Sequence, residues 1–277
     1  MEIIITVDEF ETLSNFIYRK TGIKFEPKKI YYVSKRIEKR MDILNIKTVT
    51  EYIKYIRFSD SKGIEFQNLI EILTVNETYF FRDFPQLESF AEYCLEDVAQ
   101  KKILKKDKKI RIWSAACSTG EEPYTIAIIL KEMLDWSHSW QIEITASDID
   151  TVVLEKAKKG FYTSRSLREV PNEYLKKYFK ESVLGWSVTE EIKQMVVFQN
   201  MNLHNREEIR KNKGFDFIFC RNLLIYFDDI SRKQLVDQFY LALNIGGYIF
   251  LGSSESLGRI SSAFKLKRAG QFLVYYK

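Results

Sequence analysis

The first third of the chain places apolar residues at helical spacing between polar caps. One apolar stripe predicts an amphipathic helix with a buried face formed by Ile30, Val33, Ile37, Met41 and Leu44. Thr6 with Glu9 forms a capping-box pattern ahead of an earlier helix, and Thr48 begins a second such pattern. A fourth helix is predicted over residues 64–73. We therefore expect residues 1–75 to form a small all-helical domain.

Further along, short apolar strands alternate with helical patterns. Helices are predicted over residues 85–103, 151–159 and 230–243, and strands over residues 110–113, 142–148, 215–220 and 248–251. This alternation is typical of an α/β sheet. The expected fold class is therefore α/β: the helical domain, a linker motif and helix over residues 76–109, and a Rossmann-like domain over residues 110–277.

Two segments of the second domain are less regular. Residues 160–180 show no regular spacing of apolar residues. Residues 185–188 and 194–198 are predicted to form a small hairpin, so a small β subdomain is expected at about residues 181–197. Residues 264–276 predict a second hairpin that turns near Gly270.

Length and charge limit the possible classes of protein. A chain of 277 residues is long enough for about two domains with a substantial core. The net charge of +5 is modest, but residues 24–40 carry seven basic and two acidic side chains, and residues 101–111 carry seven basic and one acidic. Either run can be a solvated face or a surface for an acidic partner.

Cysteine and hydropathy patterns exclude further classes. Cys94, Cys117 and Cys220 are widely spaced and odd in number, with only two histidines in the chain, so buried thiols are favoured over disulfides or zinc. No stretch approaches the ~18 apolar residues of a membrane helix, and the amino terminus lacks a signal-peptide pattern. We expect a cytoplasmic protein with no membrane insertion.

The turn over residues 114–120 is the strongest candidate for a ligand site. It is rich in small residues and follows a strand, so a ligand can approach the backbone there. It holds one glycine and no lysine, unlike dinucleotide and P-loop motifs. Glu121 and Glu122 open the next helix, where they either complement the helix dipole or bind a cationic ligand. S-adenosylmethionine fits better than a phosphate, with Asp148 placed to hold its ribose.

The whole chain resembles the chemotaxis receptor glutamate methyltransferases, the CheR family. The resemblance rests on five motifs in one order, namely residues 76–82, 113–124, 147–150, 201–203 and 219–227. It implies a Rossmann-like S-adenosylmethionine-dependent methyltransferase domain with an antiparallel last strand, no metal, and S-adenosylhomocysteine as the product.

The resemblance also implies a set of site residues. The positions that match the family's cofactor site are Asn76, Thr78, Arg82, Ala116, Glu122, Asp148, Asn202, Leu203 and Arg221. For catalysis, Arg82 is expected to capture the substrate carboxylate and Tyr226 to orient one of its oxygens. A glutamate is already ionised at neutral pH, its reference pKa being ~4.3, so no general base is needed.

The partner implied by the resemblance is the helical cytoplasmic domain of a methyl-accepting chemoreceptor. The basic helix expected to meet it carries Lys28, Lys35, Arg36, Lys39 and Arg40. The same surface could equally serve nucleic acid. Some relatives grip a receptor tail with a glycine-rich hairpin, but the short tip at Gly185 argues against that here.

Two rival functions use the same sheet. A nucleic-acid or small-molecule methyltransferase is one, although residues 220–223 lack the proline-containing tetrad of amino-directed nucleic-acid enzymes. A non-catalytic cofactor sensor is the other. It would keep Glu122 and Asp148 but would need neither Arg82 nor Tyr226, and the presence of both favours catalysis.

Overall fold

The structure is a computed structural model that describes residues 5–135 and 139–277 of the chain. The chain divides into two compact units. The first, here the helical unit, comprises the chain up to Val75 together with Ile225–Ser231. The second, here the sheet unit, comprises Asn76–Leu224 and Arg232–Lys277.

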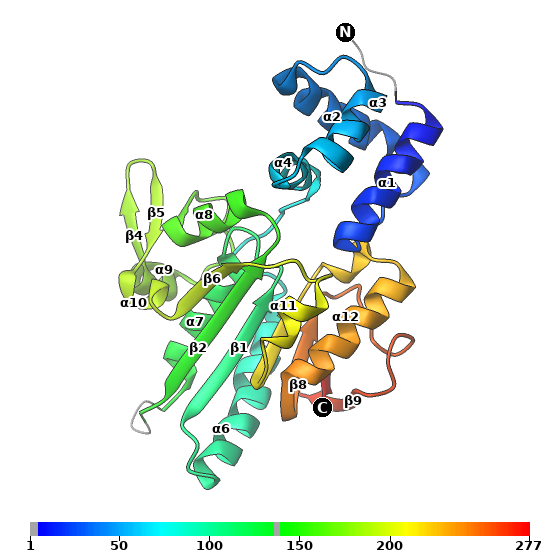
Figure 1. Ribbon diagram of the computed structural model, residues 1–277. Helices are drawn as coiled ribbons and strands as arrows, with labels where there is room; N and C mark the ends of the chain where they lie inside the picture. The colour runs from blue at the N-terminus through cyan, green and yellow to red at the C-terminus, as the bar shows by residue number, and fades with distance from the viewer. Residues whose placement is uncertain (1–4, 136–138) are drawn as a thin grey trace. The chain divides into compact units, whose positions relative to one another are not determined.

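The helical unit contains the four predicted helices. They are α1 (Val7–Thr21), α2 (Ile30–Leu44) after the short turn η1 (Pro27–Lys29), α3 (Val49–Lys54) continued by the π-helical turn η2 (Tyr55–Ser59), and α4 (Ile64–Leu73) (Figure 1). The capping box at α1 is confirmed, because Thr6 Oγ1 accepts a hydrogen bond from Glu9 N over 3.3 Å and Thr6 N donates to Glu9 Oε2 over 3.1 Å. At α3, Thr48 Oγ1 accepts from Glu51 N over 3.2 Å, which is one of the two bonds of a capping box.

A carboxylate lies buried inside this unit. Glu65 is 3 % exposed and accepts from Arg40 Nε over 2.9 Å and from Tyr52 Oη over 2.8 Å. A buried carboxylate is tolerated only when it is paired in this way. The apolar core around it comes from the predicted stripes of α1 and α2, with Phe10, Leu13, Ile17, Val33, Ile37 and Met41 all buried.

A seven-stranded sheet forms the centre of the sheet unit. Its order is β6 (Val196–Asn200), β2 (Gln141–Asp148), β1 (Lys109–Ala115), β7 (Phe215–Cys220), β8 (Leu243–Leu251), β10 (Phe272–Tyr276) and β9 (Lys265–Ala269). The first five strands are parallel, and β10 is antiparallel to both β8 and β9. The predicted α/β fold with an antiparallel last strand is confirmed.

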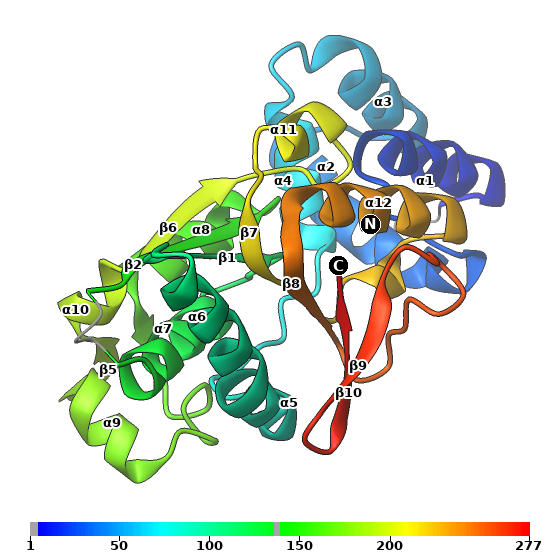
Figure 2. The same cartoon turned by 90° about the horizontal axis from the view of Figure 1, so that it is seen from below.

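Helices cover both faces of this sheet (Figure 2). On one face, α5 (Phe84–Ser89), the π-helical turn η3 (Phe90–Cys94) and α6 (Leu95–Leu104) run on from each other. The Phe90 ring meets Phe217 and Phe219 edge-on at 5.1 Å. On the other face, Phe239 of α12 (Asp229–Ala242) meets Trp113 at 5.3 Å. The remaining helices next to the sheet are α7 (Glu121–Met133), α8 (Thr151–Lys159) and α11 (Arg206–Arg210).

The small β subdomain differs from the prediction. Its antiparallel sheet has the order β3 (Phe161–Tyr162), β5 (Gly185–Val188) and β4 (Phe179–Ser182), and α9 (Asn172–Tyr178) and α10 (Glu190–Lys193) lie beside it in the chain. The predicted pairing of residues 185–188 with residues 194–198 is wrong. The second segment becomes β6, which pairs in parallel with β2 at the edge of the large sheet.

Two further expectations concern side chains and membranes. All three cysteines are buried and free, as predicted. Within residues 5–135 and 139–277, no helix is both long enough and apolar enough to cross a membrane.

Candidate active site

The candidate site lies at the carboxyl ends of β1, β2 and β7. The chain leaves β1 for β2 on one side, while β7 lies on the other, so the strand order reverses here. Open α/β sheets bind ligands in the crevice at such a point. The predicted turn connects β1 to α7 at this position.

The turn after β1 is built from strained backbone. Ala116, Ser118 and Gly120 have φ values of 63°, 49° and 94°, in the left-handed region. Such conformations are costly for residues with a Cβ atom and are common at functional sites. At Gly120 a Cβ atom would lie 2.9 Å from Ala157 Cβ of α8, so only glycine fits between the turn and that helix.

Asp148 ends β2 and fixes the turn. Its Oδ2 accepts from Ser118 N over 2.8 Å and its Oδ1 accepts from Asp150 N over 3.0 Å. Burial raises the pKa of Asp148 to about 6, although these two backbone donors oppose the shift. Each carboxylate oxygen has two lone pairs, so Asp148 can accept further hydrogen bonds from a ligand hydroxyl.

Residues from two other segments meet at the same place. Asn76 Nδ2 donates to Asp150 Oδ2 over 2.9 Å, and Asp150 caps α8 through Val152 N and Val153 N. Met201 N donates to Asp148 O over 2.9 Å. The segment after β6 therefore starts beside Asp148.

Asn202 and Leu203 follow directly in that segment. Asn202 Oδ1 accepts from His204 N, and Asn202 N donates to Glu208 Oε2, both over 3.0 Å. These bonds shape the turn after β6, and Leu203 lies half-buried within it. Thr78 is likewise half-buried, two residues after Asn76.

The two acidic residues at the start of α7 have different neighbours. Glu121 is buried and accepts from Thr119 Oγ1 over 2.6 Å and from Ser166 Oγ over 3.1 Å, so it fixes two loops. Glu122 accepts from Ser114 Oγ over 2.7 Å and lies 3.3 Å from Arg221 Nη1. Burial raises the pKa of both carboxyl groups, and Arg221 partly opposes the shift of Glu122.

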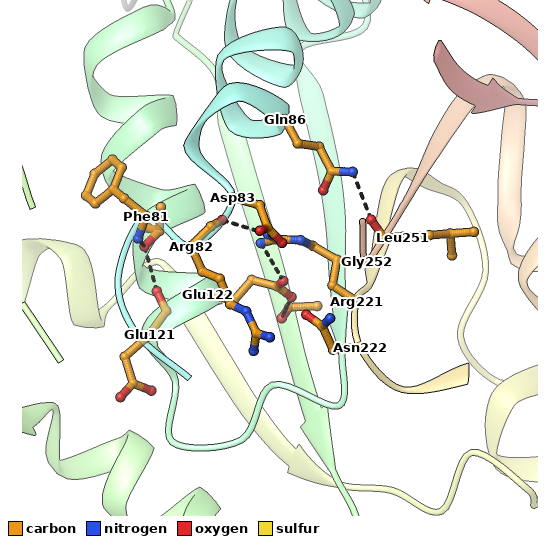
Figure 3. Close-up of polar contacts among 12 residues, drawn as sticks. Phe81, Arg82, Asp83, Gln86, Glu121, Glu122, Arg221, Asn222, Leu251 and Gly252 are labelled. Carbon is orange, nitrogen blue, oxygen red and sulfur yellow. Dashed lines mark hydrogen bonds and ion pairs between the residues drawn. The ribbon is translucent and has the colours of Figure 1, made fainter. Parts of the chain in front are cut away.

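Arg221 follows β7 and connects the site to the linker motif (Figure 3). Its side chain is 3 % exposed, and its Nη2 donates to Arg82 O over 2.6 Å and to Asp83 Oδ2 over 2.7 Å. The guanidinium therefore lies between the carboxylates of Glu122 and Asp83. Arg221 fixes the backbone of Arg82, in addition to the cofactor contact expected from the sequence.

The Arg82 side chain is only partly buried. Its Nη1 donates to Glu77 O over 2.8 Å, and its Cζ lies 5.8 Å from the Tyr79 ring centroid. Burial raises the pKa of Glu122, and the positive charge of Arg82 opposes this shift together with that of Arg221. Both backbone neighbours of Arg82 are left-handed, since Phe81 has φ 58° and Asp83 has φ 56°.

Two of the three aromatic residues of the linker motif lie in the core. Phe80 is 0 % and Phe81 2 % exposed, and both belong to the core. Phe80 packs edge-on against Tyr162 and Phe179, and Phe81 stacks on Tyr174. Of the three aromatic residues, Tyr79 alone is half-buried.

Tyr226 belongs to the segment Ile225–Ser231 of the helical unit. Its carbonyl accepts from Lys24 N over 3.0 Å, and Phe227 forms an isolated antiparallel bridge with Ile23. Tyr18 Oη of α1 donates to Asp228 Oδ2 over 2.9 Å. The segment that carries Tyr226 is therefore fixed by α1 and the residues after it.

Sequence patterns missed three acidic residues of the site. Asp83 pairs with Arg221, Asp150 joins Asn76 to α8, and Glu255 Oε2 accepts from Asn222 N over 2.8 Å and from Gly252 N over 2.7 Å. Each stands in a turn just after a motif or strand, where acidic residues are common. Only Asp150 had a local signal, because it precedes an apolar helix as a possible cap.

The site has polar atoms suited to a ligand. Within the described part of the chain, Ser118 Oγ and Arg221 Nε are buried without a hydrogen-bond partner. The site also holds five carboxylates, those of Asp83, Glu121, Glu122, Asp148 and Asp150, against the guanidinium groups of Arg82 and Arg221. An excess of carboxylates repels phosphate and favours a cationic ligand, so the residues fit S-adenosylmethionine, which carries an ammonium and a sulfonium.

The chain matches known families over almost its whole length. Residues 76–272 match the family model described as "CheR methyltransferase, SAM binding domain", and residues 8–74 match "CheR methyltransferase, all-alpha domain". The boundary between the two matches falls where the helical unit passes into the sheet unit.

Curated relatives agree with these matches. The chain is 47 % identical to chemotaxis protein methyltransferase 2 of Vibrio cholerae over 100 % of this chain and 95 % of the relative. It is 35 % identical to the chemotaxis protein methyltransferase of Borreliella burgdorferi over 93 % of this chain and 91 % of the relative. It is 33 % identical to the chemotaxis protein methyltransferase of Escherichia coli over 93 % of this chain and 87 % of the relative. The chain therefore belongs to the CheR methyltransferase family and is an S-adenosylmethionine-dependent methyltransferase.

Proposed function

We propose that this methyltransferase modifies glutamate side chains of chemoreceptors in the cytoplasm. A carboxylate oxygen of the glutamate bonds to the methyl group of S-adenosylmethionine as the sulfur–methyl bond breaks, which gives a γ-glutamyl methyl ester and S-adenosylhomocysteine. The similarity to full-length chemotaxis protein methyltransferases supports this substrate class.

The cofactor would be held by the residues at the carboxyl edge of the sheet. Asp148 would accept hydrogen bonds from the ribose hydroxyls, and Glu122 would attract the methionine ammonium group. The remaining contacts would come from Asn76, Thr78, Arg82, Ala116, Asn202, Leu203 and Arg221.

Arg82 would act on the substrate. The single observation that carries this role is that the backbone of Arg82 is fixed by buried Arg221 while its guanidinium stays half-exposed. A guanidinium ~4 Å from a carboxylate can contribute up to ~4 kcal/mol at an effective dielectric constant of ~20. Arg82 would thus bring the carboxylate close to the methyl group, and Tyr226 would orient one of its oxygens. Alignment of the two reacting groups can supply ~7–11 kcal/mol.

The docking surface for the receptor would be narrower than the sequence suggested. Arg36 stacks on Tyr32 at 3.3 Å and donates to Ile72 O over 2.8 Å, while Arg40 pairs with buried Glu65 over 2.5 Å. These two arginines stabilise the helical unit. The remaining basic residues of the set are Lys28 in the turn η1 and Lys35 and Lys39 on α2. Lys28 forms an exposed pair with Glu26, Lys35 forms a part-buried pair with Glu38, and Lys39 is exposed.

The experiment is methyl transfer with purified components. We would incubate the protein with S-adenosylmethionine that carries a tritiated methyl group and with a chemoreceptor cytoplasmic fragment, and then release methanol with base. Wild type should give base-labile methanol. Arg82→Ala should lose the transfer but bind S-adenosylhomocysteine within a few-fold of wild type, because Arg82 acts mainly on the substrate. Activity of Arg82→Ala equal to wild type would remove Arg82 from the reaction.

A matched control separates receptor modification from other methylation. RNA in place of the receptor fragment should give no incorporation. Incorporation into RNA but not into receptor would refute the proposal and support the nucleic-acid alternative.

A further inference from the structure

Two arginines lie against one aromatic ring in the sheet unit, and a third arginine accepts a hydrogen bond from one of them. Arg168 Cζ lies 3.7 Å from the centroid of the Tyr79 ring, and Arg82 Cζ lies 5.8 Å from the same centroid. Arg168 Nη1 donates to Arg165 O over 3.2 Å. The proposed substrate-binding arginine and the two arginines of a distant loop therefore share one neighbourhood.

The loop that carries Arg165 and Arg168 is firmly attached to the linker motif. Phe80 N donates to Ser166 O over 3.0 Å, and Ser166 Oγ donates to Glu121. Leu167 is buried at 6 % exposure. The loop therefore has a fixed position relative to the residues just before Arg82 and to the start of α7.

The two loop arginines still have donors to offer. Arg165 is 81 % exposed and lies 3.9 Å from Glu77 Oε1, which is a long contact between exposed groups. Such a contact contributes little to stability. A guanidinium stacked on a ring, as Arg168 is on Tyr79, keeps the N–H groups at its edge free to bind carboxylates in its own plane.

We propose that Arg165 and Arg168 bind a second carboxylate of the receptor, about one helical turn from the glutamate that is methylated. This inference rests on the proposed function. It assigns to the loop a role in substrate choice, because a receptor helix with two acidic residues on one face would bind better than a helix with one.

The distances of Arg82 and Arg168 from the Tyr79 ring allow both to reach one face of a receptor helix. Arg82 and Arg168 contact the same ring, so their guanidinium carbons are closer together than the sum of the two distances to its centroid. Side chains three or four residues apart on a helix have Cβ atoms ~5–6 Å apart, and one turn rises ~5.4 Å. One acidic face of a helix can therefore meet both arginines at once.

The test compares two double variants in the tritium assay with the receptor fragment. Arg165→Ala with Arg168→Ala should raise KM for the fragment by about tenfold, since two charge pairs would be lost. The kcat and the affinity for S-adenosylhomocysteine should stay within twofold of wild type. The matched control is Lys105→Ala with Lys108→Ala, which removes the same charge from exposed positions just before β1, at the opposite edge of the sheet. The control should keep the wild-type KM.

Salt and receptor variants make the test specific. The wild-type KM should rise with ionic strength, and this rise should be smaller for the arginine double variant. Glu→Gln substitution on the receptor one turn from the methylated glutamate should raise the wild-type KM but leave the KM of the arginine variant unchanged.

Three outcomes would overturn the inference. The first is an arginine variant with the KM of the lysine control. The second is weaker binding of S-adenosylhomocysteine, which would place these arginines at the cofactor. The third is a receptor Glu→Gln effect that persists in the arginine variant. Failure of the proposed function would look different, because wild type itself would then give no base-labile methanol.

Discussion

Arg221 Nη2 lies 2.7 Å from Asp83 Oδ2, and this ion pair joins the end of β7 to the turn that carries Arg82. The two residues are 138 positions apart in the sequence. The pair places the linker motif at the carboxyl edge of the sheet, so its loss should affect both stability and catalysis.

Arg221→Ala should lower the free energy of unfolding by about 3 kcal/mol, because Glu122 and Asp83 would lose their common partner in a mostly buried site. Urea denaturation without cofactor measures this change. Arg82→Ala is the matched control and should cost less than about 1 kcal/mol, because that side chain is half-exposed. Equal losses in the two variants would contradict the structural role of Arg221.

Cofactor affinity should depend on pH through Asp148. The ionised carboxylate accepts hydrogen bonds better, and burial raises its pKa to about 6. Calorimetry should therefore show that the affinity for S-adenosylhomocysteine rises from pH 5 to about pH 6.5 and then levels off. At the acidic end the rise should be up to about tenfold per pH unit.

The stability of the cofactor-free protein should change in the opposite direction. A raised carboxyl pKa means that the folded protein binds more protons than the unfolded chain between pH ~4 and ~6, so this group lowers the free energy of unfolding as pH rises through that window. The Asp148→Asn variant should bind S-adenosylhomocysteine more weakly than wild type. Its cofactor affinity and its free energy of unfolding should both lose the pH dependence that comes from Asp148. An unchanged pH profile in this variant would assign the effect to other groups.

Gly120→Ala should destabilise the turn after β1 in two ways. A left-handed φ of 94° strains an alanine, and its Cβ would lie 2.9 Å from Ala157 Cβ. We expect a loss of about 2–3 kcal/mol and weaker cofactor binding. Gly246→Ala is the control, since its φ is 82° but nothing lies within 4 Å of the added Cβ. It should lose only about 1 kcal/mol. Similar losses of stability in Gly120→Ala and Gly246→Ala would mean that the close approach of residue 120 to α8 contributes little.

Arg40 and its neighbour Lys39 should differ in their effects. Arg40→Ala leaves buried Glu65 with only Tyr52 as a partner and should lower the free energy of unfolding by about 3 kcal/mol in urea denaturation. Lys39→Glu, at an exposed position, should leave stability unchanged but raise KM for the receptor fragment by several-fold. A Lys39→Glu variant with the wild-type KM would exclude Lys39 from receptor binding. A Lys39→Glu variant with lower stability would contradict the expectation that this side chain has no structural role.

Much of the fold follows from local patterns. Helices α4 and α8 and strand β7 have the predicted bounds, because caps, glycines or a continuous apolar run mark their ends. The segment at residues 194–198 was assigned the wrong partner. Apolar alternation identifies a strand but not the strand it pairs with, and β2 is about 50 residues earlier in the chain.

The site was only partly predictable for a related reason. Ala116, Glu122 and Asp148 stand in one recognisable strand–turn–helix–strand unit, so their convergence follows from chain order. Asp83 and Glu255 act through partners in remote segments, Arg221 and Asn222, and no short sequence window contains both members of either pair.

The most direct test of the central claim is mass spectrometry of a chemoreceptor cytoplasmic fragment after incubation with this protein and S-adenosylmethionine. We predict one added methyl group on individual glutamate side chains, removed by mild base, and no such addition with Arg82→Ala. A fragment without added methyl groups, or with methyl groups only on other side chains, would contradict the assignment.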